Sequence, residues 1–81
     1  METRVAVISM IVEEPEAAEK LNALLHNYRR YIIGRMGIPY REKGIGIISV
    51  ALDAPTDTIN ALTGVLGRIS GVVAKAAYAK T

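Results

Sequence analysis

The 81-residue sequence lacks several residue types on which small proteins often depend. It contains no cysteine, so disulfide bonds and thiolate metal sites are excluded. Phenylalanine and tryptophan are also absent, and there is one histidine, His26. No apolar run approaches the roughly 20 residues of a membrane span, and the first ten residues are too mixed in character for a signal peptide. We expect a cytoplasmic protein that needs no metal or other cofactor and does not enter a membrane.

The chain is short enough that its own core must be thin. We expect one domain over residues 1–81. Domains of this size bury only about 60% of their unfolded surface, which leaves a thin core. Small domains without disulfides or metals often associate with other chains. The composition is 51% hydrophobic, which favours association of the chain with copies of itself.

Charge is distributed unevenly along the sequence. The net charge is +2, but residues 1–25 carry a net −3 and residues 26–43 a net +4. A basic segment beside an acidic one suits contacts between subunits or with an anionic partner. We favour subunit contacts, because the net charge is too small for a dedicated nucleic-acid surface. Direct nucleic-acid binding is therefore not expected.

The sequence nearly repeats itself at an offset of 40 residues. Residues 5–15 read VAVISMIVEEP, and residues 45–55 read IGIISVALDAP. Ile8, Ser9 and Pro15 recur as Ile48, Ser49 and Pro55. A period near 40 in a chain of this length indicates two copies of one structural unit.

Hydrophobic periodicity predicts a strand, a helix, two strands, a helix and a strand. Alternating β-branched residues indicate the strands, and apolar stripes at helical spacing indicate the helices. Pro15 suits the first position of the first helix, and Pro55 precedes the second. The turn before the third strand is expected at Arg41–Gly44. The strands are predicted at Arg4–Val12, about Tyr31–Ile38, Ile45–Leu52 and Val72–Ala79.

This order, βαββαβ, predicts an α+β fold, the ferredoxin-like sandwich with antiparallel sheet order 4-1-3-2. Right-handed crossovers place both helices on one face of the sheet. The first and third strands are apolar on both faces, as central strands are, so the face without helices is apolar too. We expect that face to be covered by another copy of the chain, or the sheet to extend from chain to chain.

No residue pattern indicates catalysis. Helical spacing places His26 near Asn22 and Arg30, without a group that would orient it as a general base. Ser9 and Ser49 lie within strands as small packing residues, and no base accompanies them. Residues 43–50, KGIGIISV, have the spacing of an RNA-recognition strand, but every position that would carry a stacking ring is aliphatic. The protein is therefore not expected to be an enzyme.

The whole chain resembles a family of small proteins known as iron-only hydrogenase system regulators. The resemblance lies in TRVAVISMIVEEP, LNALLHNY, NALTGVLGRISGVVAKAAYAK and above all in residues 34–55. That family is similar to the ligand-binding domain of nickel-responsive repressors and to ACT-type regulatory domains. The resemblance implies a ferredoxin-like oligomer with effectors bound at subunit interfaces.

Two departures limit what this resemblance implies. The nickel-responsive domain takes its ligands from His and Cys on the second strand and the start of the third, and residues 33–46 contain neither. Nickel binding at that site is not expected. The repressors also have a DNA-binding segment for which this chain has no room, so any role in transcription would need a partner or an effector.

The function that we expect is that of a homo-oligomeric, ACT-like regulatory module. Its partners would be further copies of the chain, in a dimer or tetramer, with a small effector or another protein. An effector would bind at a subunit interface near the loops after the first and third strands. The alternative is a structural interaction module without a ligand. The candidate interface residues, where charge, glycine and aromatic residues converge, are Glu13, Glu14, Arg35, Met36, Tyr40 and Arg41.

Overall fold

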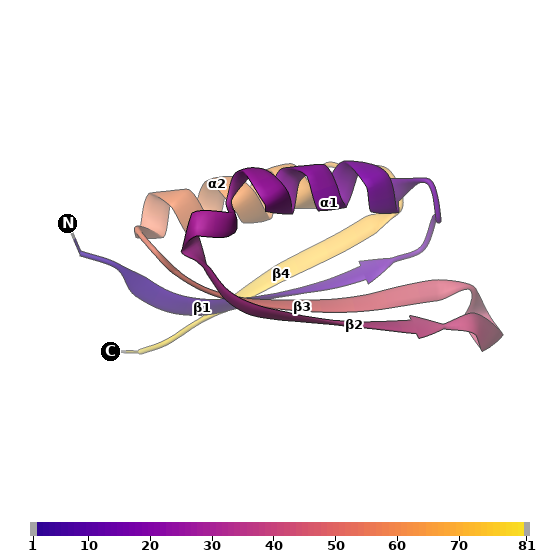
Figure 1. The fold of residues 1–81 in the computed structure, drawn as a ribbon, viewed down its shortest axis with the longest axis horizontal. Helices are drawn as coiled ribbons and strands as arrows, with labels where there is room; N and C mark the ends of the chain where they lie inside the picture. The colour runs from indigo at the N-terminus through magenta and orange to yellow at the C-terminus, as the bar shows by residue number, and fades with distance from the viewer. Residues whose placement is uncertain (1, 81) are drawn as a thin grey trace.

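The computed structural model describes residues 2–80 and contains six regular elements joined by short turns (Figure 1). Two short 3₁₀ turns, η1 at Arg29–Tyr31 and η2 at Arg41–Lys43, flank the second strand. The strands and helices are β1 Arg4–Val12, α1 Ala17–Asn27, β2 Ile32–Tyr40, β3 Ile45–Ala54, α2 Thr56–Gly67 and β4 Val72–Tyr78.

The four strands form one antiparallel sheet in the order β2-β3-β1-β4. This is the predicted order 4-1-3-2 counted from the other edge, so the ferredoxin-like α+β prediction is confirmed. Both helices lie on the same side of the sheet, and no element within residues 2–80 covers the other side (Figure 1). Glycine and proline mark β2 as an edge strand, and it lies at the edge.

The two sequence repeats form the centre of the sheet. β1 and β3 pair along their whole length, and Ser9 lies directly opposite Ser49. Because the strands are antiparallel, the equivalent serines mark the point about which the two halves of the domain are related. The repeat in the sequence is therefore a rotational repeat in the structure.

The core lies between the sheet and the helices. Alternate residues of β1 and β3 point toward the helices, as a strand's period of two requires. α1 and α2 each contribute one stripe of apolar side chains to the core, at helical spacing. No buried side chain of the described residues is polar or charged. The nine largest fully buried side chains are those of Ile8, Met10, Leu21, Leu25, Val50, Leu52, Ile59, Leu62 and Leu66.

Two glycines make turns that other residues would adopt only with strain. Gly44 ends η2 with φ +65°, and Gly71 precedes β4 with φ +84°. Both lie in the left-handed region, where a Cβ atom costs free energy. The predicted turn at Arg41–Gly44 is confirmed.

Three predicted boundaries differ by two residues. Pro15 lies in the turn before α1, which begins at Ala17 with Glu16 as its N-cap, so Pro15 is not the first helical residue. β3 continues past Leu52 to Ala54. β2 continues through Pro39 to Tyr40 and does not stop at Ile38. An edge strand tolerates proline because only one of its sides carries ladder hydrogen bonds.

Candidate binding surfaces

The side of the sheet without helices, which we call the open face, presents three rows of side chains across all four strands. The rows follow from the register, because residues paired across antiparallel strands point to the same side. The large row is made of Ile38, Ile47, Ile11 and Val73. Next to it, the central row is made of Met36, Ser49, Ser9 and Lys75. The small row is made of Gly34, Ala51, Val7 and Ala77.

Large apolar side chains on the open face are in contact with solvent. Met36 is 57% exposed, Ile38 47%, Ile47 36% and Val73 49%. Isolated exposed aliphatic residues are ordinary, but a contiguous apolar patch on a small protein usually marks a contact surface. The open face therefore has the composition of a binding surface.

The small row is low where it crosses β2 and β3, at Gly34 and Ala51. A shallow hollow of about 280 Å³ opens there, lined by Gly34, Arg35, Met36, Ser49 and Ala51. Glycine and alanine leave this space because their side chains do not reach above the sheet. The open face thus carries both raised aliphatic side chains and a depression beside them.

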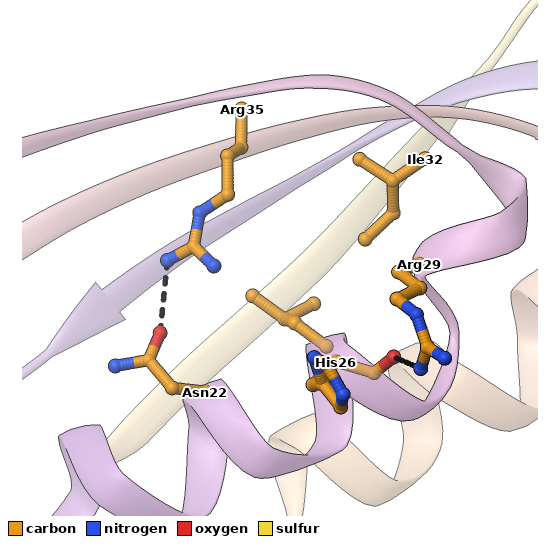
Figure 2. A pocket seen from close by; sticks show the side chains of 6 residues that line it. Asn22, His26, Arg29, Ile32 and Arg35 are labelled. Carbon is orange, nitrogen blue, oxygen red and sulfur yellow. Dashed lines mark hydrogen bonds between the residues drawn. The ribbon is translucent and has the colours of Figure 1, made fainter.

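A second surface lies at the edge of the molecule between α1 and β2, and we call it the cationic pocket. It has a volume of about 340 Å³ and is shown in Figure 2. The Arg35 guanidinium donates a hydrogen bond to Asn22 Oδ1 at 2.9 Å, and the Arg29 guanidinium donates one to the His26 main-chain oxygen at 2.9 Å. The lining residues are Asn22, Leu25, His26, Arg29, Ile32 and Arg35, and none of them is acidic.

The two surfaces use neighbouring residues of β2 that point in opposite directions. Arg35 pairs with the buried Val50 and reaches α1, whereas Met36 pairs with Ser49 on the open face. A β-bulge between Ile32 and Gly34 determines which residues of β2 point to which side of the sheet. One extra residue in a strand exchanges the sides to which the following residues point. The bulge therefore assigns Arg35 to the cationic pocket.

The six predicted interface residues do not meet in a single pocket of the described residues. Glu13 and Glu14 follow β1, and Tyr40 and Arg41 lie at the same end of the sheet with β3 between them. Arg35 and Met36 lie midway along β2, on opposite faces. The loops after β1 and β3 are at opposite ends of the sheet, because these strands are antiparallel.

Some of these six residues have local partners. The Glu13 amide donates a hydrogen bond to the Gly71 carbonyl oxygen at 2.7 Å, and the Ser70 hydroxyl lies 3.4 Å from Glu14 Oε2. The Tyr40 hydroxyl donates to Glu42 Oε2 at 3.2 Å. Glu13 and Glu14 thus connect the β1–α1 turn to the turn before β4, which is a structural role.

Sequence reasoning missed the cationic pocket. Helical spacing predicts Arg30 beside His26, but α1 ends at Asn27 and the chain tightens into the 3₁₀ turn η1. Helical spacing therefore does not hold beyond Asn27, and the pocket receives Arg29, which donates to the His26 main-chain oxygen. Arg30 instead packs over the ring of Tyr31, with its guanidinium carbon 5.2 Å from the ring centre.

The described residues show little that resembles a metal-binding or catalytic arrangement of side chains. Within residues 2–80, no group of three or more His, Cys, Asp or Glu side chains is placed to hold a metal ion. Ser9 and Ser49 face each other on the open face, away from His26 on α1. None of the described helices is long and apolar enough to cross a membrane.

Comparison with known proteins identifies relatives over nearly the whole chain. Residues 4–76 match a family model described as "TM1266-like: Iron-only hydrogenase system regulator, putative". The chain is similar to a solved structure, that of the uncharacterized protein TM1266 from Thermotoga maritima, with 40% sequence identity and a TM-score of 0.93. That match covers 98% of this chain and 100% of the other. No curated protein matches the chain.

Proposed function

This chain belongs to the TM1266-like family of iron-only hydrogenase system regulators, and on that premise we propose that it is a homo-oligomeric, ACT-like regulatory module. It has no catalytic role of its own and acts through an effector or a protein partner bound at its subunit interfaces. The observation that carries this proposal is the apolar open face, which no element within residues 2–80 covers. The occupant that we propose for this face is a second copy of the chain.

The size of the open face supports this occupant. Four strands about 4.8 Å apart, each about nine residues long at roughly 3.3 Å per residue, present on the order of 550 Å² per chain. Two copies face to face would bury about 1,100 Å² in total, just above the roughly 1,000 Å² expected of a specific interface. The face is therefore large enough for a dimer, at the small end of the range.

The relief of the open face also fits a second copy. In such a dimer a twofold axis would run between the two sheets, parallel to the central row. Rotation about this axis places the large row of one copy over the small row of the other. Raised isoleucines then meet the hollow beside Gly34 and Ala51. The strands of the two sheets remain roughly aligned, as they do in packed sandwiches. Lys75, on the edge strand β4, keeps its ammonium group in solvent.

Both sheet edges are poorly suited to the alternative, which is pairing of β2 or β4 with another chain. β2 contains Gly34, Gly37 and Pro39 and a bulge, and β4 carries the exposed Lys75. Bulges, proline and lysine are devices that protect edge strands from pairing. Face-to-face contact therefore agrees better with these residues than extension of the sheet does.

Analytical ultracentrifugation of the parent chain and of Ile38→Glu tests the interface. We expect the parent to sediment as a dimer or tetramer at micromolar concentration. In a symmetric interface each substitution occurs twice, and a buried charge without a partner costs several kcal/mol. The neighbours of Ile38 on the open face, Met36, Tyr40 and Ile47, are uncharged, so we expect Ile38→Glu to weaken association by at least about a hundredfold. Ile38 is 47% exposed on an edge strand, so the chain should still fold.

Ala61→Glu is the matched control, because it adds the same charge to an exposed position of α2 on the helix side. We expect it to associate as the parent does. Circular dichroism of all three proteins establishes that they are folded. A parent that sediments as a single chain at micromolar concentration would refute the proposal, and so would an Ile38→Glu variant that associates as tightly as the parent.

The effector would lie where the interface meets the end of the sheet. Met36 and Tyr40 belong to the open face, and Glu13, Glu14 and Arg41 lie at its end, so these remain our candidate contacts in the assembled protein. A thermal-shift screen of amino acids, nucleotides and metal ions tests this part, because a ligand stabilises by RT ln(1 + [L]/Kd). A flat response would favour the alternative, an interaction module without a ligand.

A further inference from the structure

We propose that the cationic pocket between α1 and β2 binds a small organic anion, with a phosphate or carboxylate group held by Arg35 and an apolar body against Leu25 and Ile32. The inference rests on the proposed regulatory function and adds a second ligand site to it, apart from the interface contacts proposed above. The pocket lies within one chain, so binding there can be measured whether or not the chain assembles.

Arg35 is held in place for this role. Its hydrogen bond to Asn22 Oδ1, at 2.9 Å, directs the guanidinium across the pocket from β2 toward α1 (Figure 2). A guanidinium has five N–H donors in a planar fork, and this contact uses one of them. A side chain that is already oriented loses less conformational entropy when it binds a ligand. Asn22 therefore acts as a positioning residue for Arg35.

Arg29 supplies a second cation on the other side of the pocket (Figure 2). Its bond to the His26 main-chain oxygen, at 2.9 Å, places a guanidinium at the C-terminal end of α1. That bond also reduces the negative field of the helix end, which would otherwise oppose an anion. The His26 ring adds a further hydrogen-bonding group from the same helix.

The charge around the pocket favours an anion. Glu19, the nearest acidic residue in sequence on this side of α1, is one turn before Asn22 and is not part of the lining. The pocket also accounts for two cations of the basic segment, residues 26–43. Two cations in one pocket repel each other, and a bound anion relieves that repulsion.

The floor of the pocket selects an organic ligand over a bare inorganic ion. Leu25 is buried beneath it, and Ile32 is half-buried at its side. A volume of about 340 Å³ lies at the lower end of the range for small-molecule sites. An anion with a short apolar body satisfies the arginines and the floor together. Because Arg35 faces α1 and not the open face, the pocket stays accessible when a second copy covers that face.

The experiment measures binding of phenyl phosphate by isothermal titration calorimetry and by amide shifts in ¹H–¹⁵N NMR spectra, with phenol as the uncharged control. We expect saturable binding in the millimolar range or tighter, with the largest shifts at residues 26–35. Arg35→Gln should weaken it by about tenfold or more, as the loss of a charge-assisted hydrogen bond does. Arg68→Gln, which removes the same charge from an exposed position after α2, should bind as the parent does.

Two further measurements identify the preferred anion and test this inference separately from the proposed function. Benzoate in place of phenyl phosphate tells whether the pocket prefers a carboxylate, and tighter binding of either anion than of phenol supports the site. Phenol binding as tightly as both anions, no saturation up to about 10 mM, or equal losses in Arg35→Gln and Arg68→Gln would overturn it. So would binding of an oligonucleotide alone. Sedimentation of the same samples reports the oligomer independently.

Discussion

Replacing Gly71 by alanine should destabilise the fold much more than the same change at Gly44. Both glycines have positive φ, +84° and +65°, so each substitution carries a backbone strain of about 1 kcal/mol. Their surroundings differ. A Cβ atom on Gly44 would meet nothing within 4 Å, whereas one on Gly71 would lie 2.7 Å from both Cβ and Cγ of Glu14.

The magnitude follows from this contact. The Glu14 Cβ atom is attached to the main chain and cannot swing away, and the adjacent Glu13 amide donates to the Gly71 carbonyl oxygen at 2.7 Å. Relieving the overlap must therefore shift the β1–α1 turn or stretch that hydrogen bond. Overpacking of this kind typically costs about 1–3 kcal/mol. We expect about 2–4 kcal/mol for Gly71→Ala and about 1 kcal/mol for Gly44→Ala.

Urea unfolding followed by circular dichroism, at one protein concentration because association changes apparent stability, measures both. Glu14→Gly removes the whole side chain that Gly71→Ala would strike, so in that background Gly71→Ala should cost only the backbone strain. Equal losses for the two glycine variants, or additive effects of Glu14→Gly and Gly71→Ala, would refute the reasoning. A coupling between them would assign Glu14 a structural role, which competes with its predicted role in effector binding.

Four further outcomes are expected. Leu52→Ala should lower the free energy of unfolding by about 2–5 kcal/mol in urea titrations, because Leu52 is fully buried between sheet and helices. Gly46→Ala should raise it by about 0.5–1 kcal/mol, because the added Cβ makes an ordinary 3.8 Å contact with Val12 Cβ and restricts the unfolded chain. Asn22→Ala should weaken phenyl phosphate binding in calorimetry, but less than Arg35→Gln does, because it frees the guanidinium without removing it. The melting temperature of the parent should rise with protein concentration in calorimetric scans, as it does when folding is coupled to association.

The topology was predictable because its signals are local and repeated. Alternating aliphatic residues mark β1 and β3, and the 40-residue offset identifies them as equivalent central strands. The boundaries were less predictable. Pro15 lies before α1 and Pro39 lies within β2, because each position is decided by neighbouring elements and not by proline alone. The likeness to hydrogenase-system regulators, read from residues 34–55 above all, agrees with the family match over residues 4–76.

The two candidate surfaces also differ in how far the sequence predicts them. The apolar character of the open face was evident from the strands themselves, because most residues on both sides of each central strand are apolar. The cationic pocket was not evident. His26 and Arg35 are nine residues apart in the sequence, and the turn η1 and the bulge in β2 both lie between them.

By itself, then, the sequence determined the order of the strands and the apolar face left without helices, since these depend on hydrophobic patterns within short segments. Only the tertiary structure decided that Arg35 meets Asn22 on α1 while Met36 faces the other way. The physical reason is that side chains alternate along a strand, so the one extra residue of the bulge between Ile32 and Gly34 exchanges the two faces of everything that follows it.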